Sequence, residues 1–362
     1  MESRRRAWTA LVLARLSARR ALALADALGG AEAVVRADAA RLAALGVRAE
    51  RAAAIAAAQA AVPALLARLA AAGARVVTWA DDEYPSRLRQ IPDPPPALFV
   101  RGEVADLDRP AVAVVGARRA SGYGRRVAEE LGRDLAAAGL VVVSGLAAGI
   151  DGAAHRGALA ADGRTVAVLG TGIDQVYPPW HGDLAREIAA SGAIATEFPP
   201  GTPPLPGHFP QRNRIVSGLA VATVVVEADE RSGSLITAAH ALDQNRSVFA
   251  VPGPVGSSRH AGPHRLIREG AGLVRSAEDV LAEIAPSLID RLAHRRVERE
   301  AARLEPDERL VIDALRQDEV QLEALIITTG MRSEAVLETL LALELRGLVV
   351  QSAGKRFRGR AA

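Results

Sequence analysis

The stretch AVAVVGARRASGYG (Ala111–Gly124) decides the fold: a short apolar run ends in a glycine, turns through two arginines and opens an Ala-rich segment of helical length. Five further runs have the same character: LVVVSG (140–145), TVAVLG (165–170), AIATEF (193–198), ATVVVEA (222–228) and SVFAVPG (247–253). Apolar runs without alternation are typical of strands buried on both faces of a parallel sheet. Helical segments between them predict an α/β fold with a doubly wound, mostly parallel sheet, over residues 106–285.

Residues 1–73 are predicted to form a helical domain. The segment LAALGVRAERAAAIAAA (Leu42–Ala58) has a helix end, a turn at Gly46 and a second helix with Ala52 and Ile55 facing inward. This is the pattern of a helix-hairpin-helix, whose turn amides can hold a phosphate. A small packing domain that never touches nucleic acid fits the pattern about as well. Eleven arginines against five acidic residues in 1–72 favour a polyanion only slightly.

The rest of the chain divides into three further parts. Residues 74–105 are a proline-rich connector with a strand near 98–100, residues 286–303 a charged linker helix, and residues 304–362 a winged-helix domain of three helices and a hairpin. Its would-be recognition helix is acidic, with Glu334, Glu338 and Glu344, and fits a major groove poorly. We therefore interpret this domain as a protein-contact or regulatory module. DNA binding is a weaker alternative, supported by four basic residues near its end: Lys355, Arg356, Arg358 and Arg360.

Composition excludes several classes of protein. There is no cysteine, which rules out disulfides, thiolate zinc sites and a cysteine nucleophile, and suits a reducing cytoplasm. The basic start MESRRRAW is followed by apolar residues broken by arginines, so no signal peptide is expected. The longest Ala-rich stretch, 51–72, contains Gln59, Pro63 and Arg68 and is expected to be too weakly hydrophobic for a membrane span. These observations predict a cytoplasmic protein that does not enter membranes.

The turn after the first strand predicts an anion site. It lacks the G-x-G-x-x-G spacing of dinucleotide-binding proteins. Gly116 allows a sharp exit from the strand, Ser121 is a candidate helix N-cap, and Arg118 and Arg119 add charge at the same rim. Backbone donors together with a planar guanidinium group suit a phosphate, whereas the alternative is a tight turn with solvated arginines.

The later turns supply polar residues at the same edge of the sheet. In SGLAAGIDGAAH (144–155), glycines allow close approach of a ligand, Asp151 is expected to cap the helix, and His155 is interpreted as a buried core histidine. Asn213 could cap its helix, and the arginines on either side of it are expected to face a ligand. Ser232, Gly233 and Ser234 begin another helix and suit a phosphate or a sugar edge.

No constellation predicts catalysis. His260 and His264 are separated by Gly262 and Pro263, which argues against a metal site on one helical face, and no G-x-S-x-G elbow occurs. We expect no catalytic residue, metal or cofactor. The alternative is an enzyme that cleaves nucleotides at the glycosidic bond, a nucleotide phosphoribohydrolase with Glu227 as acid or base, although the expected P-G-G-x-G-T signature is absent. A sequence-specific DNA regulator is disfavoured by the acidic helix.

Taken together, these motifs resemble one known family. GARRASGYG, SGLAAGIDGAAHRGAL, FPQRNRIVSGLA and EADERSGSLITAAHALDQNRSVFAVPG closely resemble the DNA-processing protein A family (DprA, also called Smf) across about 84–275, and the flanks resemble a sterile-alpha-motif-like domain and a winged helix. The resemblance implies a Rossmann-like core that binds single-stranded DNA without catalytic turnover. It also implies a homodimer that loads the recombinase RecA onto strands covered by single-strand-binding protein, protecting incoming DNA in natural transformation.

The resemblance also assigns residues. Arg118 stands at the arginine of the family's G-S/A-R turn, and the S-G-x-A-x-G-I-D, R-N-R-I and S-G-S segments have their counterparts in the later turns. The turn YPPWHGD lacks the basic residue expected there, although His181 could contribute. Stacking partners for bases are scarce: Tyr123, Tyr177, Trp180 and Phe209. The predicted nucleic-acid-binding residues are Gly116, Arg118, Ser121, Gly124, Ser144, Gly145, Gly149, Arg212, Asn213, Arg214, Ser232, Gly233 and Ser234.

Overall fold

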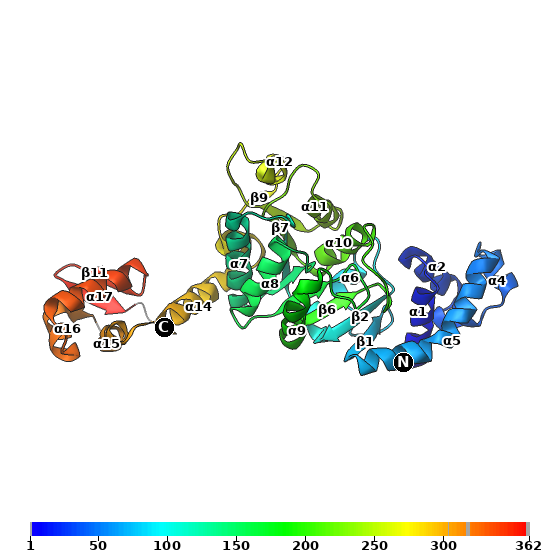
Figure 1. Ribbon diagram of the computed structural model, residues 1–362, viewed down its shortest axis with the longest axis horizontal. Helices are drawn as coiled ribbons and strands as arrows, with labels where there is room; N and C mark the ends of the chain where they lie inside the picture. Colours follow the sequence, from blue (N-terminus) through cyan, green and yellow to red (C-terminus); the bar gives the residue numbers. More distant parts are fainter. Residues whose placement is uncertain (1, 303, 316–318, 360–362) are drawn as a thin grey trace. The chain divides into compact units, whose positions relative to one another are not determined.

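The chain forms two compact units, Met1–Pro286 and Ser287–Ala362, in the computed structural model. The structure describes residues 2–302, 304–315 and 319–359. Each unit has its own hydrophobic core. Figure 1 shows the helices and strands of the chain, coloured along the sequence.

A nine-stranded sheet forms the centre of the first unit, in the order β1-β2-β6-β5-β4-β3-β7-β8-β9. Strands β3 to β9 run parallel, and β1 and β2 add an antiparallel end. All six apolar runs form strands, which confirms the predicted α/β fold. The strands are β1 (Ala74–Thr78), β2 (Ala97–Gly102), β3 (Ala111–Val115), β4 (Val141–Ser144), β5 (Thr165–Val168), β6 (Ala193–Thr196), β7 (Ala222–Val225), β8 (Ser247–Ala250) and β9 (Gly272–Leu273).

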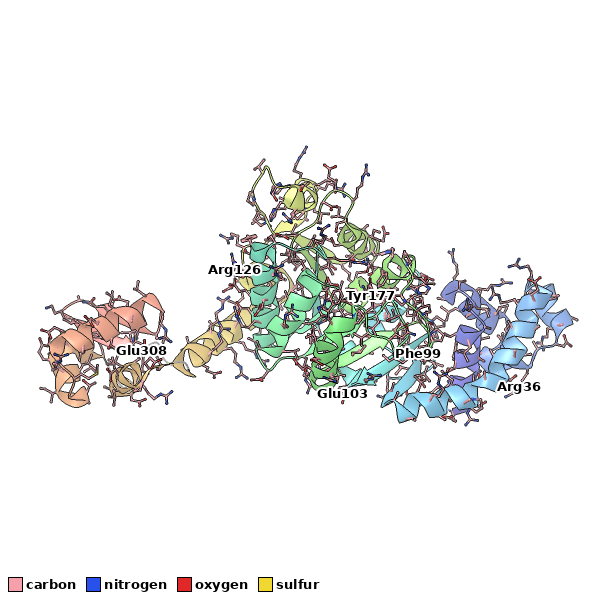
Figure 2. All side chains as sticks on the ribbon, viewed as in Figure 1. Arg36, Phe99, Glu103, Arg126, Tyr177 and Glu308 are labelled. Carbon is pink, nitrogen blue, oxygen red and sulfur yellow. The ribbon has the colours of Figure 1, made fainter. Side chains whose placement is uncertain are left out.

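Helices cover both faces of this sheet. Right-handed crossovers that leave β3 in opposite directions place their helices on opposite faces. Alternate residues of β2 show the two layers: Leu98 and Val100 pack with Ile215 of α10, and Phe99 packs with Ile188 of α9 (Phe99 is labelled in Figure 2). The helices are α6 (Ser86–Arg89), α7 (Gly122–Ala137), α8 (Ile150–Leu159), α9 (Gly182–Ser191), α10 (His208–Leu219), α11 (Gly233–Asp243), α12 (Ala261–Arg268) and α13 (Ala277–Ile284).

The proline-rich segment belongs to the sheet, which corrects its description as a connector. Its strands β1 and β2 pair with each other, and β2 pairs with β6. The Tyr84 hydroxyl donates to the carbonyl of Pro95 at 2.6 Å and so links the part of this segment after β1 to the run of prolines before β2. The prolines lie between β1 and β2, where their missing N–H groups remove no hydrogen bond of the sheet, so regular structure survives on either side of them.

The N-terminal residues form the predicted helical domain, with α1 (Glu2–Leu13), α2 (Ala18–Leu28), α3 (Ala31–Arg36), α4 (Ala39–Ala44) and α5 (Ala49–Ala71). Gly46 adopts a φ of +75° in the turn between α4 and α5, and both Ala52 and Ile55 are buried, as the helix-hairpin-helix pattern predicts. The Arg5 guanidinium pairs with Asp81 at 3.1 Å and ties this domain to the segment after β1.

Helix α5 corrects the expectation that residues 51–72 are too weakly hydrophobic for a membrane span. By length and composition it could cross a membrane, with a mean hydropathy of 1.6 over its most apolar window. Its buried residues Ile55, Val62 and Leu69 pack into hydrophobic clusters of the first unit, which is the behaviour of a core helix. The polar residues that suggested weak hydrophobicity are too few to offset the many alanines.

The second unit is a winged helix, as predicted. Helices α15 (Pro306–Ala314), α16 (Leu322–Thr329) and α17 (Ser333–Leu345) pack around Val311, Leu325 and Leu340, and a sheet has the order β10-β12-β11. Its strands are β10 (Val320–Gln321), β11 (Val349–Ser352) and β12 (Arg356–Gly359), and helix α14 (Ile289–Ala302) comes before α15. Glu308, labelled in Figure 2, pairs with Arg346 at 2.8 Å. Arg360 lies outside the described residues.

Candidate functional site

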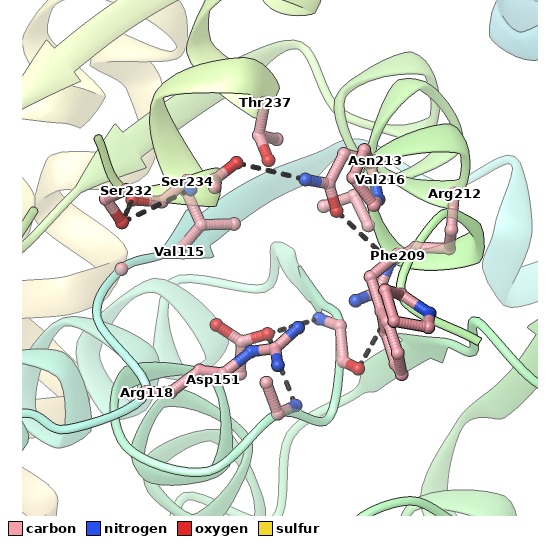
Figure 3. A pocket seen from close by; sticks show the side chains of 16 residues that line it. Val115, Arg118, Asp151, Phe209, Arg212, Asn213, Val216, Ser232, Ser234 and Thr237 are labelled. Carbon is pink, nitrogen blue, oxygen red and sulfur yellow. Dashed lines mark hydrogen bonds between the residues drawn. The ribbon is translucent and has the colours of Figure 1, made fainter. Parts of the chain in front are cut away.

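A cavity of about 290 Å³ lies beyond the carboxyl ends of β3 and β4 (Figure 3). The strand order reverses at β3, because β4 lies on one side of it and β7 on the other. Open α/β sheets bind ligands at such a switch point. Eight of the predicted residues line the cavity: Gly116, Arg118, Gly145, Arg212, Asn213, Ser232, Gly233 and Ser234.

Arg118 is the cation of the cavity that solvent reaches. Its side chain is exposed, and its Cζ atom lies 4.9 Å from the centre of the Phe209 ring. A guanidinium group over an aromatic face is held in place while its N–H groups stay free to donate to an anion. Phe209 also lies 5.6 Å from Tyr177, so an aromatic pair borders the same rim.

Arg212 lines the cavity, as a ligand-facing residue would, but its side chain is buried and hydrogen-bonded to the protein. Its Nη1 donates to the carbonyl of Gly145 at 2.7 Å and also to that of Val168. Burial lowers the pKa of Arg212 to about 10, while the neighbouring Asp151 raises it. Arg212 therefore lines the cavity with positive charge while its hydrogen bonds hold the ends of β4 and β5 together.

Asp151 serves the loop after β4 and does not cap α8, whose N-cap is Gly149. Its carboxylate accepts from the amides of Gly145 at 3.1 Å and Ala147 at 3.3 Å. Burial raises the pKa of Asp151, whereas Arg212 and these amides lower it. The carboxylate offsets part of the charge of Arg212 beneath the cavity.

Arg214 does not line the cavity, which corrects the expectation that it faces a ligand there. Its guanidinium group is buried and pairs with Glu197 at 2.6 Å and with Asp93 at 2.9 Å. Two carboxylates satisfy its charge, and Nη1 also donates to Gln211. Residues 212 and 214 are two positions apart on helix α10. Their side chains therefore point about 200° apart, and only one of them can face the edge of the sheet.

Asn213 and the start of α11 form the opposite wall. Asn213 lies inside α10 rather than at its cap, and its amide donates to the carbonyl of Gly233 at 3.1 Å (Figure 3). Ser232 caps α11, and its hydroxyl lies 2.8 Å from that of Ser234. The hydroxyl groups of this wall and the N-terminus of α11 suit a phosphate.

The N-terminus of α7 already holds an anion from the protein itself. Ser121 is the N-cap, as predicted, but its amide and hydroxyl donate to the Glu227 carboxylate at 2.9 and 2.5 Å. A Cβ atom on Gly124 would come within 2.4 Å of that carboxylate. Ser121 therefore binds Glu227, and the missing side chain of Gly124 leaves room for that carboxylate, which corrects the expectation of an open phosphate site there. Glu227 is fully buried and does not line the cavity.

Ser144 and Gly149 position the loop after β4 without lining the cavity. The Ser144 hydroxyl donates to the carbonyl of Val114 at 2.7 Å. Gly149 has a φ of +82°, and a Cβ there would lie 2.3 Å from the carbonyl of Ala117. A Cβ on Gly145 would lie 2.3 Å from Arg212, so this loop passes directly over the guanidinium group.

The two histidines near the site are both buried. His155 pairs through Nδ1 with Thr165 at 2.7 Å, which confirms its interpretation as a core histidine. The His181 ring is also buried, with Nδ1 3.0 Å from the carbonyl of Leu146, so the ring lies beneath the surface and not where a bound strand would run. Trp180 beside it is 74% exposed and remains available for stacking.

Thr237 and Val216 line the cavity and were missed from the sequence. Thr237 lies one helical turn beyond Gly233, so the i, i+4 spacing on α11 could have indicated it. Among the described residues, no group of three or more His, Asp or Glu side chains could hold a metal ion.

Comparisons with known proteins agree with this architecture. Residues 75–285 match the family described as DNA recombination-mediator protein A, and residues 296–355 match the DprA winged helix domain. Protein Smf of Escherichia coli K12 is 48% identical over 207 residues, which cover 57% of this chain and 55% of that protein.

Two solved structures extend the comparison. That of DNA processing protein A from Streptococcus pneumoniae superposes with a TM-score of 0.68 at 36% identity, covering 76% of this chain and 95% of the other. That of DNA processing protein A from Helicobacter pylori, described by its single-stranded DNA binding mode, gives a TM-score of 0.53 at 29% identity and covers 59% and 96%.

Proposed function

Because this chain belongs to the DNA recombination-mediator protein A family (DprA/Smf), we propose that it binds single-stranded DNA across the carboxyl ends of its sheet. The Helicobacter pylori relative, described by its single-stranded DNA binding mode, supports this proposal. The observation that carries it is the pairing of Arg118, exposed and seated on Phe209, with a cavity at the switch point.

The site chemistry suits a strand rather than a small nucleotide. Arg118 donates to one phosphate, the Ser232 and Ser234 wall accommodates the backbone beside it, and Tyr177 and Trp180 offer exposed rings to unpaired bases. Phosphate contacts give affinity that does not depend on sequence and falls with salt, and stacking adds about 1–3 kcal/mol per base.

The protein is proposed to bind the strand without a catalytic reaction. Glu227, the acid or base of the competing phosphoribohydrolase proposal, is held by Ser121 away from the cavity, which favours binding without turnover. From its family membership we further propose that the protein is a cytoplasmic homodimer that loads a RecA recombinase onto strands covered by single-strand-binding protein. Release of free base from nucleoside monophosphates, lost in Glu227→Gln, would instead support the enzyme.

The test is an Arg118→Ala substitution. Removing one phosphate contact lowers the affinity for a labelled single strand by several fold at every sequence, and it reduces the slope of log affinity against log salt by about 0.7. Fluorescence anisotropy at several salt concentrations measures both. Arg119→Ala is the control, because Arg119 is exposed beside Arg118 but does not line the cavity. Equal binding by both variants would contradict the proposal.

A further inference from the structure

A second group of basic side chains lies in the N-terminal helical domain, away from the sheet. A cavity of about 340 Å³ forms where the loop after α1 meets the turn between α4 and α5 (helices labelled in Figure 1). Four arginines line it: Arg15, Arg20, Arg48 and Arg51. No carboxylate is found among the described residues of its lining. We name these four residues the N-terminal arginine cluster.

Within residues 2–302, 304–315 and 319–359, these arginines have no carboxylate partner. Elsewhere in the same domain, arginines pair with carboxylates, as Arg6 does with Glu2 at 2.9 Å and Arg4 with Glu32 at 3.9 Å. No described carboxylate lies within ion-pair distance of any member of the cluster. Four like charges around one cavity repel each other in the absence of a counter-charge, so an anion there relieves that repulsion.

Two members are held in place by the protein. Arg51 Nη1 donates to the carbonyl of Ala14 at 2.6 Å, and Arg20 Nη2 donates to the carbonyl of Leu45. Each bond uses one of the five N–H groups of a guanidinium and leaves the others free. The side-chain entropy of these two residues is therefore already lost before a ligand arrives, which favours binding.

The other two members face water. Arg15 and Arg48 are exposed, and in the part of the chain that the structure describes no hydrogen bond or ion pair holds either side chain. They come from separate loops, one after α1 and one before α5. A cavity with two fixed and two mobile guanidinium groups suits successive phosphates of a polymer, because each guanidinium can bind a phosphate through paired N–H groups.

We propose that the N-terminal arginine cluster is a second DNA-contact site, which binds the phosphate backbone of a strand that extends beyond the sheet cavity. The proposal rests on the proposed function for the identity of the polyanion. The two sites then act on one strand, and the second raises affinity only for strands long enough to reach both.

The experiment compares two single strands, of about 6 and about 30 nucleotides, in fluorescence anisotropy with the full chain. The test variant is Arg15→Glu with Arg48→Glu. The control is Arg41→Glu with Arg68→Glu, which changes the net charge equally at exposed positions of the same domain outside the cavity. We expect the test variant to bind the long strand at least about tenfold more weakly, with a salt slope reduced by about 1.4, and to bind the short strand as before.

Three outcomes overturn the proposal: an unchanged affinity for the long strand, an equal loss in the control variant, or an equal loss for the short strand. If the proposed function at the sheet cavity is wrong, Arg118→Ala leaves the affinity for the short strand unchanged. That result is distinct from the three outcomes above. Arg15→Gln with Arg48→Gln removes charge without reversing it, and is expected to give about half of the change in log affinity. Fluorescence of Trp8, buried in the same domain, verifies that each variant folds.

Discussion

Three arginines near the site differ in their partners, and the partners decide what each can do. Arg118 lies over the ring of Phe209, has no ion-pair partner among the described residues and is open to an anion. Arg212 donates to two strand-end carbonyls, and Arg214 is neutralised by Glu197 and Asp93. Removing one partner from a buried ion pair costs about 3–5 kcal/mol, so a variant at Arg214 would report on stability before it reported on binding.

His155 gives a pH prediction at this scale. Thr165 Oγ1 uses its hydrogen to donate to Val142, so His155 Nδ1 donates to Thr165, and Nε2 has no partner among the described residues. Burial, together with smaller effects of His181, Arg212 and Arg156, lowers the pKa of His155 to about 3. The ring is therefore neutral in the folded protein, whereas the unfolded chain takes up a proton below its ordinary pKa of about 6.5.

The sign follows from this difference in bound protons. As pH falls from about 6.5 towards 3, His155 contributes a loss of unfolding free energy of about 1.4 kcal/mol per pH unit. We expect the unfolding free energy of His155→Gln to fall less steeply with decreasing pH, by that amount per pH unit. Denaturant titrations between pH 4 and 7, followed by fluorescence of the three tryptophans, which all lie in the first unit, measure it. Parallel curves for the two proteins would contradict the prediction.

At the scale of elements, the end of β7 and the start of α7 are joined through one carboxylate. Glu227 follows β7 and accepts two hydrogen bonds from Ser121, whose hydroxyl also accepts from the amide of Gly124. A carboxylate at a helix N-terminus interacts favourably with the helix dipole. The turn thus receives from the protein the negative charge that the sequence pattern assigned to a ligand.

Ser121→Ala tests this junction. The substitution removes the helix cap and one hydrogen bond to Glu227, and we expect the free energy of unfolding to fall by about 1–2 kcal/mol. Ser121→Thr keeps the hydroxyl and is expected to retain most of that stability. Urea denaturation followed by tryptophan fluorescence compares the three proteins. A loss below about 0.5 kcal/mol for the alanine variant would show that the cap contributes little.

At the scale of the whole molecule, the two units have separate cores. Met1–Pro286 contains the sheet and the helical domain, whereas Ser287–Ala362 packs around its own cluster that includes Val311 and Phe357. Domains with their own cores usually unfold cooperatively by themselves. The α17 helix of the second unit is acidic, with Glu334, Glu338 and Glu344, so electrostatics disfavour its contact with a phosphate backbone.

A chain ending at residue 286 is therefore expected to keep its single-strand affinity and salt slope. Calorimetry of the full chain should show two transitions, of which the shorter chain retains the one of its own unit. Anisotropy titrations of both proteins with the same strand measure the affinity. Weaker binding by the shorter chain would assign the winged helix a direct part in holding DNA.

The sequence by itself determined the strand order along the chain, the winged helix and the edge at which polar residues gather. These follow from local patterns: unbroken apolar runs, glycine turns and helix-length spacing, each read within a few residues. The position of Arg118 after a strand end also places it at that edge, where it lines the cavity.

Only the tertiary structure decided which polar side chains face that cavity. Arg212 and Arg214 are neighbours in the sequence, yet carbonyls of two strands bind one and distant carboxylates bind the other. Ser121 was predicted as a cap, but the Glu227 that occupies its site lies 106 residues away. Charge and hydrogen-bond satisfaction depend on what packs within a few ångströms, and those neighbours are set by long-range strand order rather than by local pattern.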